Sequence, residues 1–303
     1  MLRLEGVCKT FGTRQVLTNL HLSLTAGTVY GLLGPNGAGK TTTINIICNL
    51  LKPDRGQVWL DNSPLSHHSK NCIGVAPQQN LLYPSLTCRE HLCFFGQLYG
   101  LRGKQLRERV KTCLELVDLT DRADSPAETL SGGMQRRLSI AVALIHQPKL
   151  VILDEPTTGL DLEARYQMWS VIRHLQERGT TLLISSHFLD EIERLCQRIG
   201  ILQQGKLIAE GTLPELRQHI PAQEIVTIQS PVEAAVLDRA HALGLVTRRY
   251  GQHLALWIPE LWELKQILEY FEGIPIDAIT RQPVTLEHIY LELTQQPAIQ
   301  TLG

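Results

Sequence analysis

The chain has 303 residues, of which 43% are hydrophobic and 19% charged, an ordinary balance for a folded protein of one or two domains. Acidic and basic residues nearly cancel to a formal net charge of −1, so the composition lacks the basic excess that nucleic-acid binding requires. No window approaches the ~18 consecutive apolar residues of a membrane span and no signal peptide opens the sequence, so we expect a cytosolic chain.

The seven cysteines are scattered and include no C-x-x-C pair. In a cytosolic chain we expect them to be reduced and to fill the core like small apolar side chains. The adjacent His67 and His68 fit a polar loop better than a pair of metal ligands.

Short apolar segments in the first third of the chain predict strands. They cover residues 2–4, 15–24, 29–33, 57–60 and 73–75. After the third strand, and before a helical apolar pattern over residues 42–51, the sequence fits the phosphate-loop pattern G-x-x-x-x-G-K-[ST]. Its residues are Gly34, Pro35, Asn36, Gly37, Ala38, Gly39, Lys40 and Thr41, with Thr42 next in the helix.

The phosphate-loop pattern predicts nucleotide binding. Its glycines let consecutive backbone N–H groups turn inward around a phosphate, and the helix N-terminus adds partial positive charge. Lys40 can reach the β- and γ-phosphates, and the Thr41 hydroxyl can ligate magnesium. A chance glycine-rich turn is the alternative, but it does not explain the strand before the loop and the helix after it.

From residue 88 to about residue 146 the pattern becomes helical, with apolar residues at spacings of three and four. Inside this segment Ser131, Gly132 and Gly133 precede a helical run over residues 138–146. Ser131 suits an N-cap, and the glycines leave backbone N–H groups open to an anion. Taken alone these residues predict a capped helix; beside the phosphate loop they predict a second phosphate-binding helix start.

The strand predicted over residues 150–153 ends in two carboxylates, Asp154 and Glu155. They stand at the carboxyl edge of a strand, where ligands of open α/β sheets bind. Because successive strand residues point in opposite directions, Asp154 can hold magnesium through water while Glu155 orients or deprotonates the attacking water. A solvated acidic turn is the plainer alternative. A helix over residues 162–178 and a strand over 181–184 complete an α/β sheet with a helical insertion.

A second unit is predicted to begin near residue 221. Its strands are expected over residues 224–229, 245–249, 253–258 and 274–279, and its helices over 232–243 and 261–271. This order is a β-α-β-β-α-β unit, the split βαβ arrangement. A last amphipathic helix is expected over residues 285–293, and the tail beyond Pro297 should be frayed.

The motifs and their order resemble those of the ATP-binding subunits of ABC transporters over about residues 1–217. The order is the phosphate loop, Gln78, the signature Leu-Ser-Gly-Gly at residues 130–133, Asp154 with Glu155, Asp161 and His187. The resemblance implies a P-loop NTPase fold with a RecA-like core, an antiparallel β subdomain and a helical signature subdomain over about residues 84–146. The ATP-binding domain would cover residues 1–220, and a small α+β domain residues 221–303.

The resemblance also implies roles for residues outside the phosphate loop. Phe11 would stack on adenine, Gln78 would sense magnesium and the attacking water, Asp161 would couple two active sites across a dimer, and His187 would reach the γ-phosphate. Alone, each has a plainer interpretation: a core aromatic, a loop amide, a helix N-cap and a polar residue after a strand.

In such a subunit ATP and Mg²⁺ bind in a head-to-tail dimer, a homodimer or a heterodimer. Each ATP would lie between the phosphate loop of one subunit and the signature of the other, here Ser131, Gly132, Gly133 and Met134. The family most often has Gln where this chain has Met134, and Gln135 is displaced by one position. The metal would be held by Thr41 and Gln78, and by Asp154 through water.

The apolar segment 80–87 and the aromatic residues that follow it resemble the region that grips a short helix of a membrane partner, although most of them suit a helix core. Residues 283–294 resemble the terminal helix of ATPases of type 2 exporters, which move drugs, lipids, polysaccharides or sodium through a separate six-span permease. We therefore expect a peripheral protein at the cytoplasmic face of the membrane, with no nucleic-acid partner. An importer ATPase with a solute-sensing C-terminal domain is the alternative, and a soluble ABC protein of DNA repair or translation is disfavoured.

Overall fold

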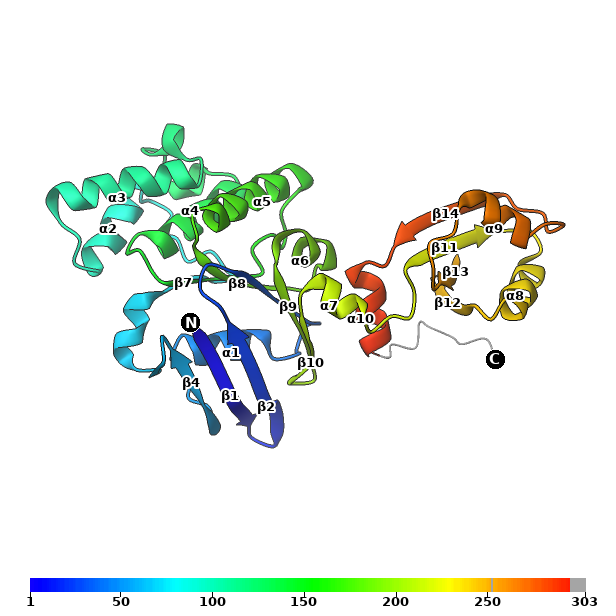
Figure 1. Ribbon diagram of the computed structural model, residues 1–303. Coiled ribbons are helices and arrows are strands. Elements are labelled where there is room, and N and C mark those ends of the chain that lie inside the picture. The colour runs from blue at the N-terminus through cyan, green and yellow to red at the C-terminus, as the bar shows by residue number, and fades with distance from the viewer. Residues whose placement is uncertain (252, 295–303) are drawn as a thin grey trace. The chain divides into compact units, whose positions relative to one another are not determined.

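A computed structural model of the protein describes residues 1–251 and 253–294 (Figure 1). The chain divides into two compact units, Met1–Glu210 and Gly211–Gly303. The second unit thus begins at Gly211 rather than at residue 221, because the short helix α7 (Leu213–Arg217) contacts α10 (Leu286–Thr294) within it. None of the helices in these described residues is long and apolar enough to cross a membrane.

The first unit contains an antiparallel four-stranded sheet in the order β2-β1-β4-β5. Its strands are β1 (Leu2–Phe11), β2 (Arg14–Leu24), β4 (Arg55–Leu60) and β5 (Ser63–Pro64). The first strand is much longer than the predicted residues 2–4, because its pairing with β2 continues to Phe11 opposite Arg14. Phe11 is therefore the last residue of β1, at the end of the β1–β2 pair.

The second sheet of this unit has six strands in the order β10-β9-β3-β8-β7-β6. They are β3 (Val29–Leu33), β6 (Ile73–Ala76), β7 (Leu150–Asp154), β8 (Thr181–Ser186), β9 (Arg198–Gln203) and β10 (Lys206–Gly211). Strand β3 runs parallel to β8 and β9, and β7 runs parallel to β8 and β6. The loops after β3, β6, β7 and β8 therefore meet at one edge, where ligands of such sheets bind.

Some helices of this unit contact the strands of the parallel sheet, and others pack on those helices (Figure 1). They are α1 (Lys40–Ile47), α2 (Cys88–Leu98), α3 (Gly103–Leu116), α4 (Gly132–Leu144), α5 (Leu162–Glu177) and α6 (Leu189–Leu195). Three 3-10 turns accompany them: η1 (His67–Cys72), η2 (Thr120–Arg122) and η3 (Ala127–Thr129). The predicted helical segment from residue 88 is thus confirmed as three helices, and His67 and His68 lie exposed in η1.

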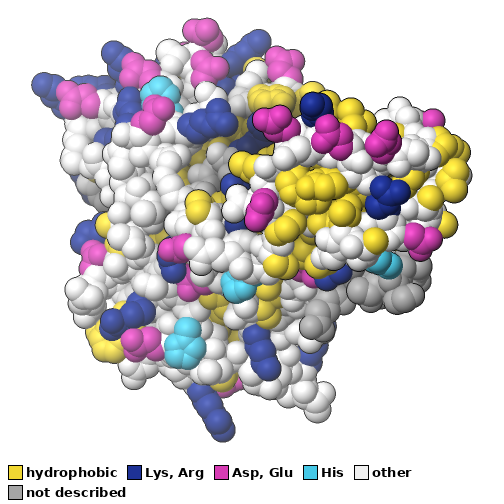
Figure 2. All heavy atoms as spheres, turned by 45° about the vertical axis from the view of Figure 1, so that its right-hand side comes forward, with side chains coloured by type: hydrophobic (Ala, Val, Ile, Leu, Met, Phe, Trp, Pro, Cys, Tyr) yellow, Lys and Arg dark blue, Asp and Glu magenta, His cyan; other side chains and the backbone are white. Residues whose placement is uncertain are grey.

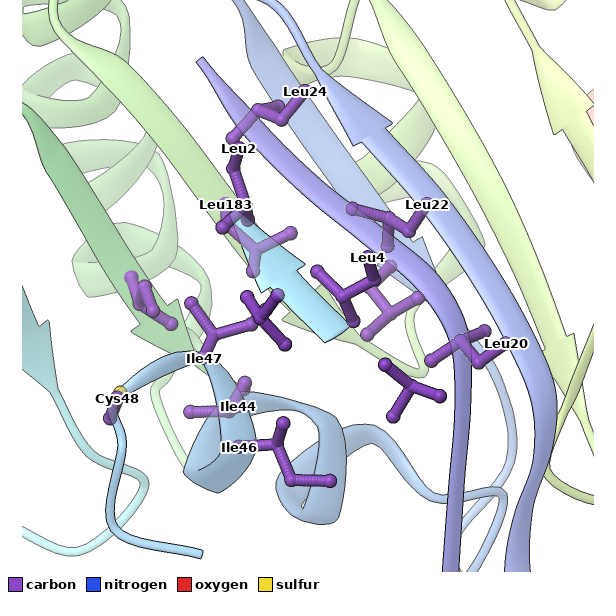
Figure 3. Close-up of a cluster of buried hydrophobic side chains, with 14 of the residues drawn as sticks. Leu2, Leu4, Leu20, Leu22, Leu24, Ile44, Ile46, Ile47, Cys48 and Leu183 are labelled. Atoms are coloured by element: carbon purple, nitrogen blue, oxygen red, sulfur yellow. The ribbon is translucent and has the colours of Figure 1, made fainter. Parts of the chain in front are cut away.

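A cluster of aliphatic side chains fixes α1, and with it the phosphate loop, between the two sheets. Figure 3 shows Leu2, Leu4 and Leu22 of the four-stranded sheet directed toward Ile47 of α1 and Leu183 of β8. All five are at most 2% exposed. Truncating a buried Leu or Ile of this kind to Ala costs about 2–5 kcal/mol. The phosphate loop is therefore held in place by the packing of α1 against both sheets.

The C-terminal unit has the predicted β-α-β-β-α-β order and a sheet in the order β12-β13-β11-β14 with antiparallel neighbours. Its elements are β11 (Glu224–Gln229), α8 (Glu233–Ala242), β12 (Val246–Tyr250), β13 (His253–Ile258), α9 (Leu264–Tyr270) and β14 (Ala278–Pro283). The prediction of the last strand at residues 274–279 was wrong, because Ile274 and Ile276 pack against the core before the strand begins. The predicted frayed tail lies outside the described residues.

Apolar side chains also reach the surface of the C-terminal unit. Figure 2 turns this unit toward the viewer and shows yellow apolar side chains gathered on it, with acidic side chains beside them. Its exposed large apolar side chains include Leu261, Leu264 and Leu268. The surface of the C-terminal unit around α9 is therefore partly apolar and exposed to solvent.

Candidate active site

A cleft of about 240 Å³ lies where the loops after β3, β6 and β7 meet. The predicted residues that line it are Pro35, Asn36, Gly37, Gly39, Lys40, Thr41, Thr42, Gln78 and Glu155. The structure therefore brings the phosphate loop, the glutamine and one carboxylate together. The two remaining loop residues, Gly34 and Ala38, are buried behind it.

Two glycines of the phosphate loop are required by close packing. A Cβ on Gly34 would lie 2.4 Å from the carbonyl oxygen of Leu202, and one on Gly39 would lie 2.7 Å from Leu17. Gly39 also has a φ of 111°, in the left-handed region, and it is the N-cap residue of α1. Among the described residues no side chain caps this helix, so its first N–H groups face the cleft as an anion site would require.

Lys40 is 6% exposed and points back over the loop. Its Nζ donates to the Gly34 carbonyl at 2.6 Å and lies 3.1 Å from Glu155 Oε1. Both side chains of this ion pair are about 6% exposed. A buried charge is expensive unless it is paired, and here each group has a partner of opposite charge. The lysine and the carboxylate are thus within reach of the same ligand.

Glu155 is held by groups from three segments. Its Oε2 accepts from His187 Nδ1 at 2.7 Å and from Thr158 Oγ1 at 3.1 Å, while its Oε1 faces Lys40. Its φ of 50° is in the left-handed region, which is strained for a residue with a side chain. The structure therefore places the predicted general base and the predicted switch histidine in direct contact.

Asp154 lies behind Glu155 at the end of β7, where it is 5% exposed. Its Oδ1 accepts from the Ser185 hydroxyl. Burial raises the pKa of Asp154, and the bond from Ser185 opposes that rise. The Ser185 hydroxyl also accepts from the backbone N–H of Glu155 at 3.2 Å. This one serine of β8 therefore binds both the Asp154 carboxylate and the Glu155 backbone.

Phe11 and Gln78 are both accessible, as ligand contacts must be. Phe11 is 50% exposed at the end of β1, with Lys9 Nζ 5.6 Å from its ring centre. This exposure contradicts the alternative of a core aromatic. Gln78 is exposed directly after β6 and lines the cleft, whereas Phe11 does not line it.

The signature residues do not line this cleft. Ser131 is the N-cap of α4 and accepts from the Met134 N–H at 3.3 Å, as the sequence predicted. Gly132 has open space around it, whereas a Cβ on Gly133 would lie 2.8 Å from the Cβ of Ala164. The first glycine leaves the helix start open, and the second lets α4 approach α5.

Asp161 is the N-cap of α5, and its side chain accepts from the Ala164 N–H at 2.8 Å. This geometry matches the plainer interpretation of Asp161 made from the sequence. Its expected coupling role across a dimer concerns a second subunit and stays a prediction.

Sequence reasoning missed several residues of the site. Arg14 and Val16 of β2 line the cleft. Ser185 holds the carboxylate pair, and the buried Arg136 of α4 binds the backbone around it. A serine ending an apolar strand beside the predicted carboxylate strand could have indicated Ser185; nothing local distinguishes Arg136 from its neighbour Arg137.

A phosphate loop after the third strand and a carboxylate after the seventh, Glu155, line one cleft of a largely parallel sheet. Together they define a P-loop nucleotide-hydrolysing protein. Comparison with known families narrows this class. The model of the ABC transporter family matches residues 17–158. Together with the relatives below, this match shows that the chain belongs to the ATP-binding proteins of ABC transporters.

Two named relatives are exporter or resistance proteins. Nod factor export ATP-binding protein I of Burkholderia lata is 38% identical over 293 residues, covering 96% of this chain and 95% of the relative. Linearmycin resistance ATP-binding protein LnrL of Bacillus subtilis is 41% identical, covering 81% of this chain and 80% of the relative. The protein is thus the ATP-binding subunit of an exporter-like transporter.

Solved structures of the same family share the fold of the first unit. An ATP-binding subunit of an ABC transporter is 30% identical with a TM-score of 0.65, covering 72% of this chain and 92% of that one. The dimeric ATP-binding cassette MJ0796 bound to ADP and Pi is 30% identical with a TM-score of 0.63, covering 70% and 98%.

Proposed function

We propose that the protein hydrolyses ATP with Mg²⁺ and thereby powers export through a separate membrane permease. The observation that carries the proposal is the position of Glu155 between Lys40 and His187 in the phosphate-loop cleft. A carboxylate in that position can accept a proton from water attacking the γ-phosphate. Lys40 is close enough to exchange its ion pair with Glu155 for the β- and γ-phosphates.

The oxygen donors near the cleft fit Mg²⁺, which prefers carboxylate and hydroxyl oxygens and keeps several waters. Thr41 and Gln78 line the cleft, and Asp154 lies behind Glu155, where a water can intervene. Bound Mg²⁺ would neutralise charge on the phosphate oxygens. The protein's own part is to hold the phosphates on the N-terminus of α1 and to keep Glu155 aimed at the attacking water.

We further propose that two subunits associate head to tail around ATP. In one chain the exposed start of α4 at Ser131 and Gly132 takes no part in the phosphate-loop cleft. It has the open N–H groups of an anion site but no phosphate loop opposite it. A partner subunit supplies that loop, and the dimeric form recorded for MJ0796 supports this arrangement.

An apolar groove of about 310 Å³ suits a short helix of the permease. Its lining residues are Leu50, Val75, Pro77, Leu81, Leu82, Phe95, Ser139 and Val142. An amphipathic helix binds such a groove through its apolar face. Pro77 lines this groove and the next residue, Gln78, lines the phosphate-loop cleft. Movement of a docked helix against Pro77 would therefore shift Gln78. We place the protein at the cytoplasmic face of the membrane, against a six-span permease.

Export is favoured over import because the likeness to an export protein includes the C-terminal unit. The Nod factor export relative aligns with 96% of this chain, whereas the solved ATP-binding cassettes cover about 70% of it. The accessory unit is therefore shared with a protein named for export. Drugs, lipids, polysaccharides and sodium remain the candidate cargo classes.

The test of the proposal is ATP turnover by the chain with its permease in vesicles. Glu155→Gln should lower turnover by about 10²–10⁴-fold, the usual contribution of a general base. It should leave binding of a fluorescent ATP analogue intact, because Gln has the shape of Glu. Lys40→Ala should abolish that binding. Turnover that survives in Glu155→Gln would remove Glu155 from the role of base.

A further inference from the structure

Arg136 lies at the junction of the signature helix and the catalytic loops. It is on the second turn of α4 and is 4% exposed, although it is a charged residue. Its three guanidinium nitrogens donate to five backbone carbonyls, those of Pro77, Gln78, Asp154, Glu155 and Pro156. The planar fork of arginine can bind several acceptors at fixed positions, which the single ammonium of lysine cannot do.

The five carbonyls belong to two segments that are far apart in sequence. The first follows β6 and contains Gln78; the second follows β7 and contains Glu155. Nη1 donates to the first segment, with 3.1 Å to the Gln78 carbonyl, and Nη2 to the second, with 3.0 Å to the Glu155 carbonyl. One side chain thus fixes the distance between the two loops that carry the glutamine and the base.

The helix that carries Arg136 is itself packed tightly on the sheet. A Cβ on Gly74 of β6 would lie 2.0 Å from the carbonyl oxygen of Ala143 in α4, so the helix touches the strand backbone. Ala143 lies two turns beyond Arg136 on the same helix face. The helix is therefore anchored at one end by this contact and at the other by the guanidinium.

Among the residues that the structure describes, Arg136 forms no direct ion pair, but carboxylates lie near it. Burial lowers its pKa, and the nearby carboxylates of Asp154, Glu191 and Glu155 oppose that change. An arginine stays protonated in such a place. Its hydrogens therefore remain available to the backbone carbonyls, while the Asp154 carboxylate binds Ser185 and the Glu155 carboxylate binds Lys40 and His187.

The bonds of Arg136 also support a strained turn. Glu155 has a φ of 50°, which costs about 1–3 kcal/mol for a residue with a side chain and persists only when its surroundings enforce it. Nη2 and Nε of Arg136 bind the carbonyls of Asp154, Glu155 and Pro156, on both sides of that residue. These bonds tie the turn that carries Glu155 to α4.

We propose that Arg136 is a positioning residue that sets Gln78 and Glu155 in place and ties them to the signature end of α4. This inference rests on the proposed ATPase function. The helix begins at Gly132, directly after Ser131, so a force on its N-terminus reaches both catalytic loops through one side chain. The clasping of the partner's ATP by the signature would thereby adjust the chain's own hydrolytic site.

The neighbouring Arg137 provides a matched control. It is also 4% exposed on α4, but it donates to the carbonyls of Val117 and Asp118 at 3.0 Å, away from the cleft. Arg136→Lys and Arg137→Lys therefore make the same substitution on the same helix at similar burial, and only the first removes bonds to the two loops. A merely structural role for Arg136 would make the two variants alike.

The experiment compares these variants in the full chain with its permease. Arg136→Lys should lower kcat by roughly 10–100-fold, as small misplacements of catalytic groups do, with ATP affinity changed less than about threefold. Hydrogen exchange should speed up in residues 77–80 and 154–158 of this variant alone, because local opening there becomes easier. Arg137→Lys should keep kcat and the exchange of both segments near wild type.

Three results would overturn the inference: kcat of Arg136→Lys within about twofold of wild type, equal losses of kcat in both variants, or unchanged exchange in the two loops. If Arg136→Lys and Arg136→Gln both fail to fold while Arg137→Lys folds, Arg136 is a stability residue and the inference is also wrong. Absence of ATP turnover in the wild-type protein would refute the proposed function instead, and the exchange measurement would still decide the role of Arg136.

Discussion

At the scale of single residues, the hydrogen-bond partners of two buried carboxylates differ, and these partners indicate what each carboxylate can do. Asp154 and Glu155 are adjacent and equally buried, yet the first accepts from a serine hydroxyl while the second faces a lysine and a histidine. Strand β7 ends at Asp154, and Glu155 has a left-handed φ of 50°, so the turn directs the two carboxylates to different partners. This difference supports the proposal that Asp154 serves the metal and Glu155 the attacking water.

His288 in α10 gives a prediction for stability against pH. It is 4% exposed, and burial lowers its pKa from 6.5 to about 4. Its Nδ1 accepts from the Thr285 N–H at 3.0 Å, so a proton on that nitrogen would face another hydrogen. Between pH 6.5 and 4 the unfolded chain binds a proton that the folded chain refuses. This stability is complete above pH 6.5 and is lost as the pH falls toward 4.

Wild type should therefore lose about 2 kcal/mol of unfolding free energy through this group between pH 8 and pH 5. Urea unfolding of the full chain at both pH values measures the loss. His288→Gln should show a smaller loss, because its amide does not titrate. His253→Gln changes an exposed histidine of the same unit and should behave like wild type. Equal losses in all three proteins would contradict the assignment.

At the scale of elements, the two signature glycines serve different purposes. Gly133→Ala should destabilise the protein by about 1–3 kcal/mol, because its methyl would overlap Ala164 of α5 and force the helices apart. Gly132→Ala meets no atom within 4 Å and should leave the melting temperature nearly unchanged. It should still lower ATP turnover if the start of α4 must approach a phosphate. Melting curves and turnover of the two variants separate packing from ligand contact.

The elements also show what the sequence could predict. Buried parallel strands such as β7 and the N-capped start of α4 carry strong local signals, and the structure confirms them. Strand β14 was misplaced because Ile274 and Ile276 serve the core from a loop, which no local pattern distinguishes from a strand. Strands β9 and β10 were overlooked in the sequence.

The sequence predicts site residues that belong to one local motif. It does not predict site residues whose role depends on packing between distant elements. The phosphate loop, Gln78 and Glu155 line one cleft, as their places after three parallel strands imply. Ser185 and Arg136 reach the same site through contacts between elements distant in the sequence. Such contacts become visible only when the strand order and the helix position are known.

At the scale of the whole molecule, the proposed site is divided between two chains. In one chain the phosphate loop lines the cleft, whereas none of Ser131, Gly132 and Gly133 does. A single chain can bind ATP but lacks half of the proposed hydrolytic site. We therefore expect two chains to associate only when ATP is bound. The dimer should live long enough to be measured only when hydrolysis is blocked.

The Glu155→Gln variant with ATP and Mg²⁺ should sediment at twice the 34.0 kDa of the chain, and with ADP as a monomer. Adding Gly132→Asp tests whether the start of α4 makes the contact. An acidic residue in the first turn stabilises a helix, so the double variant should fold. Its carboxylate would repel the partner's γ-phosphate, so it should bind ATP and yet stay monomeric. A dimer of that variant would place the interface elsewhere, and a monomeric Glu155→Gln protein with ATP, alone and beside its permease, would refute the shared site.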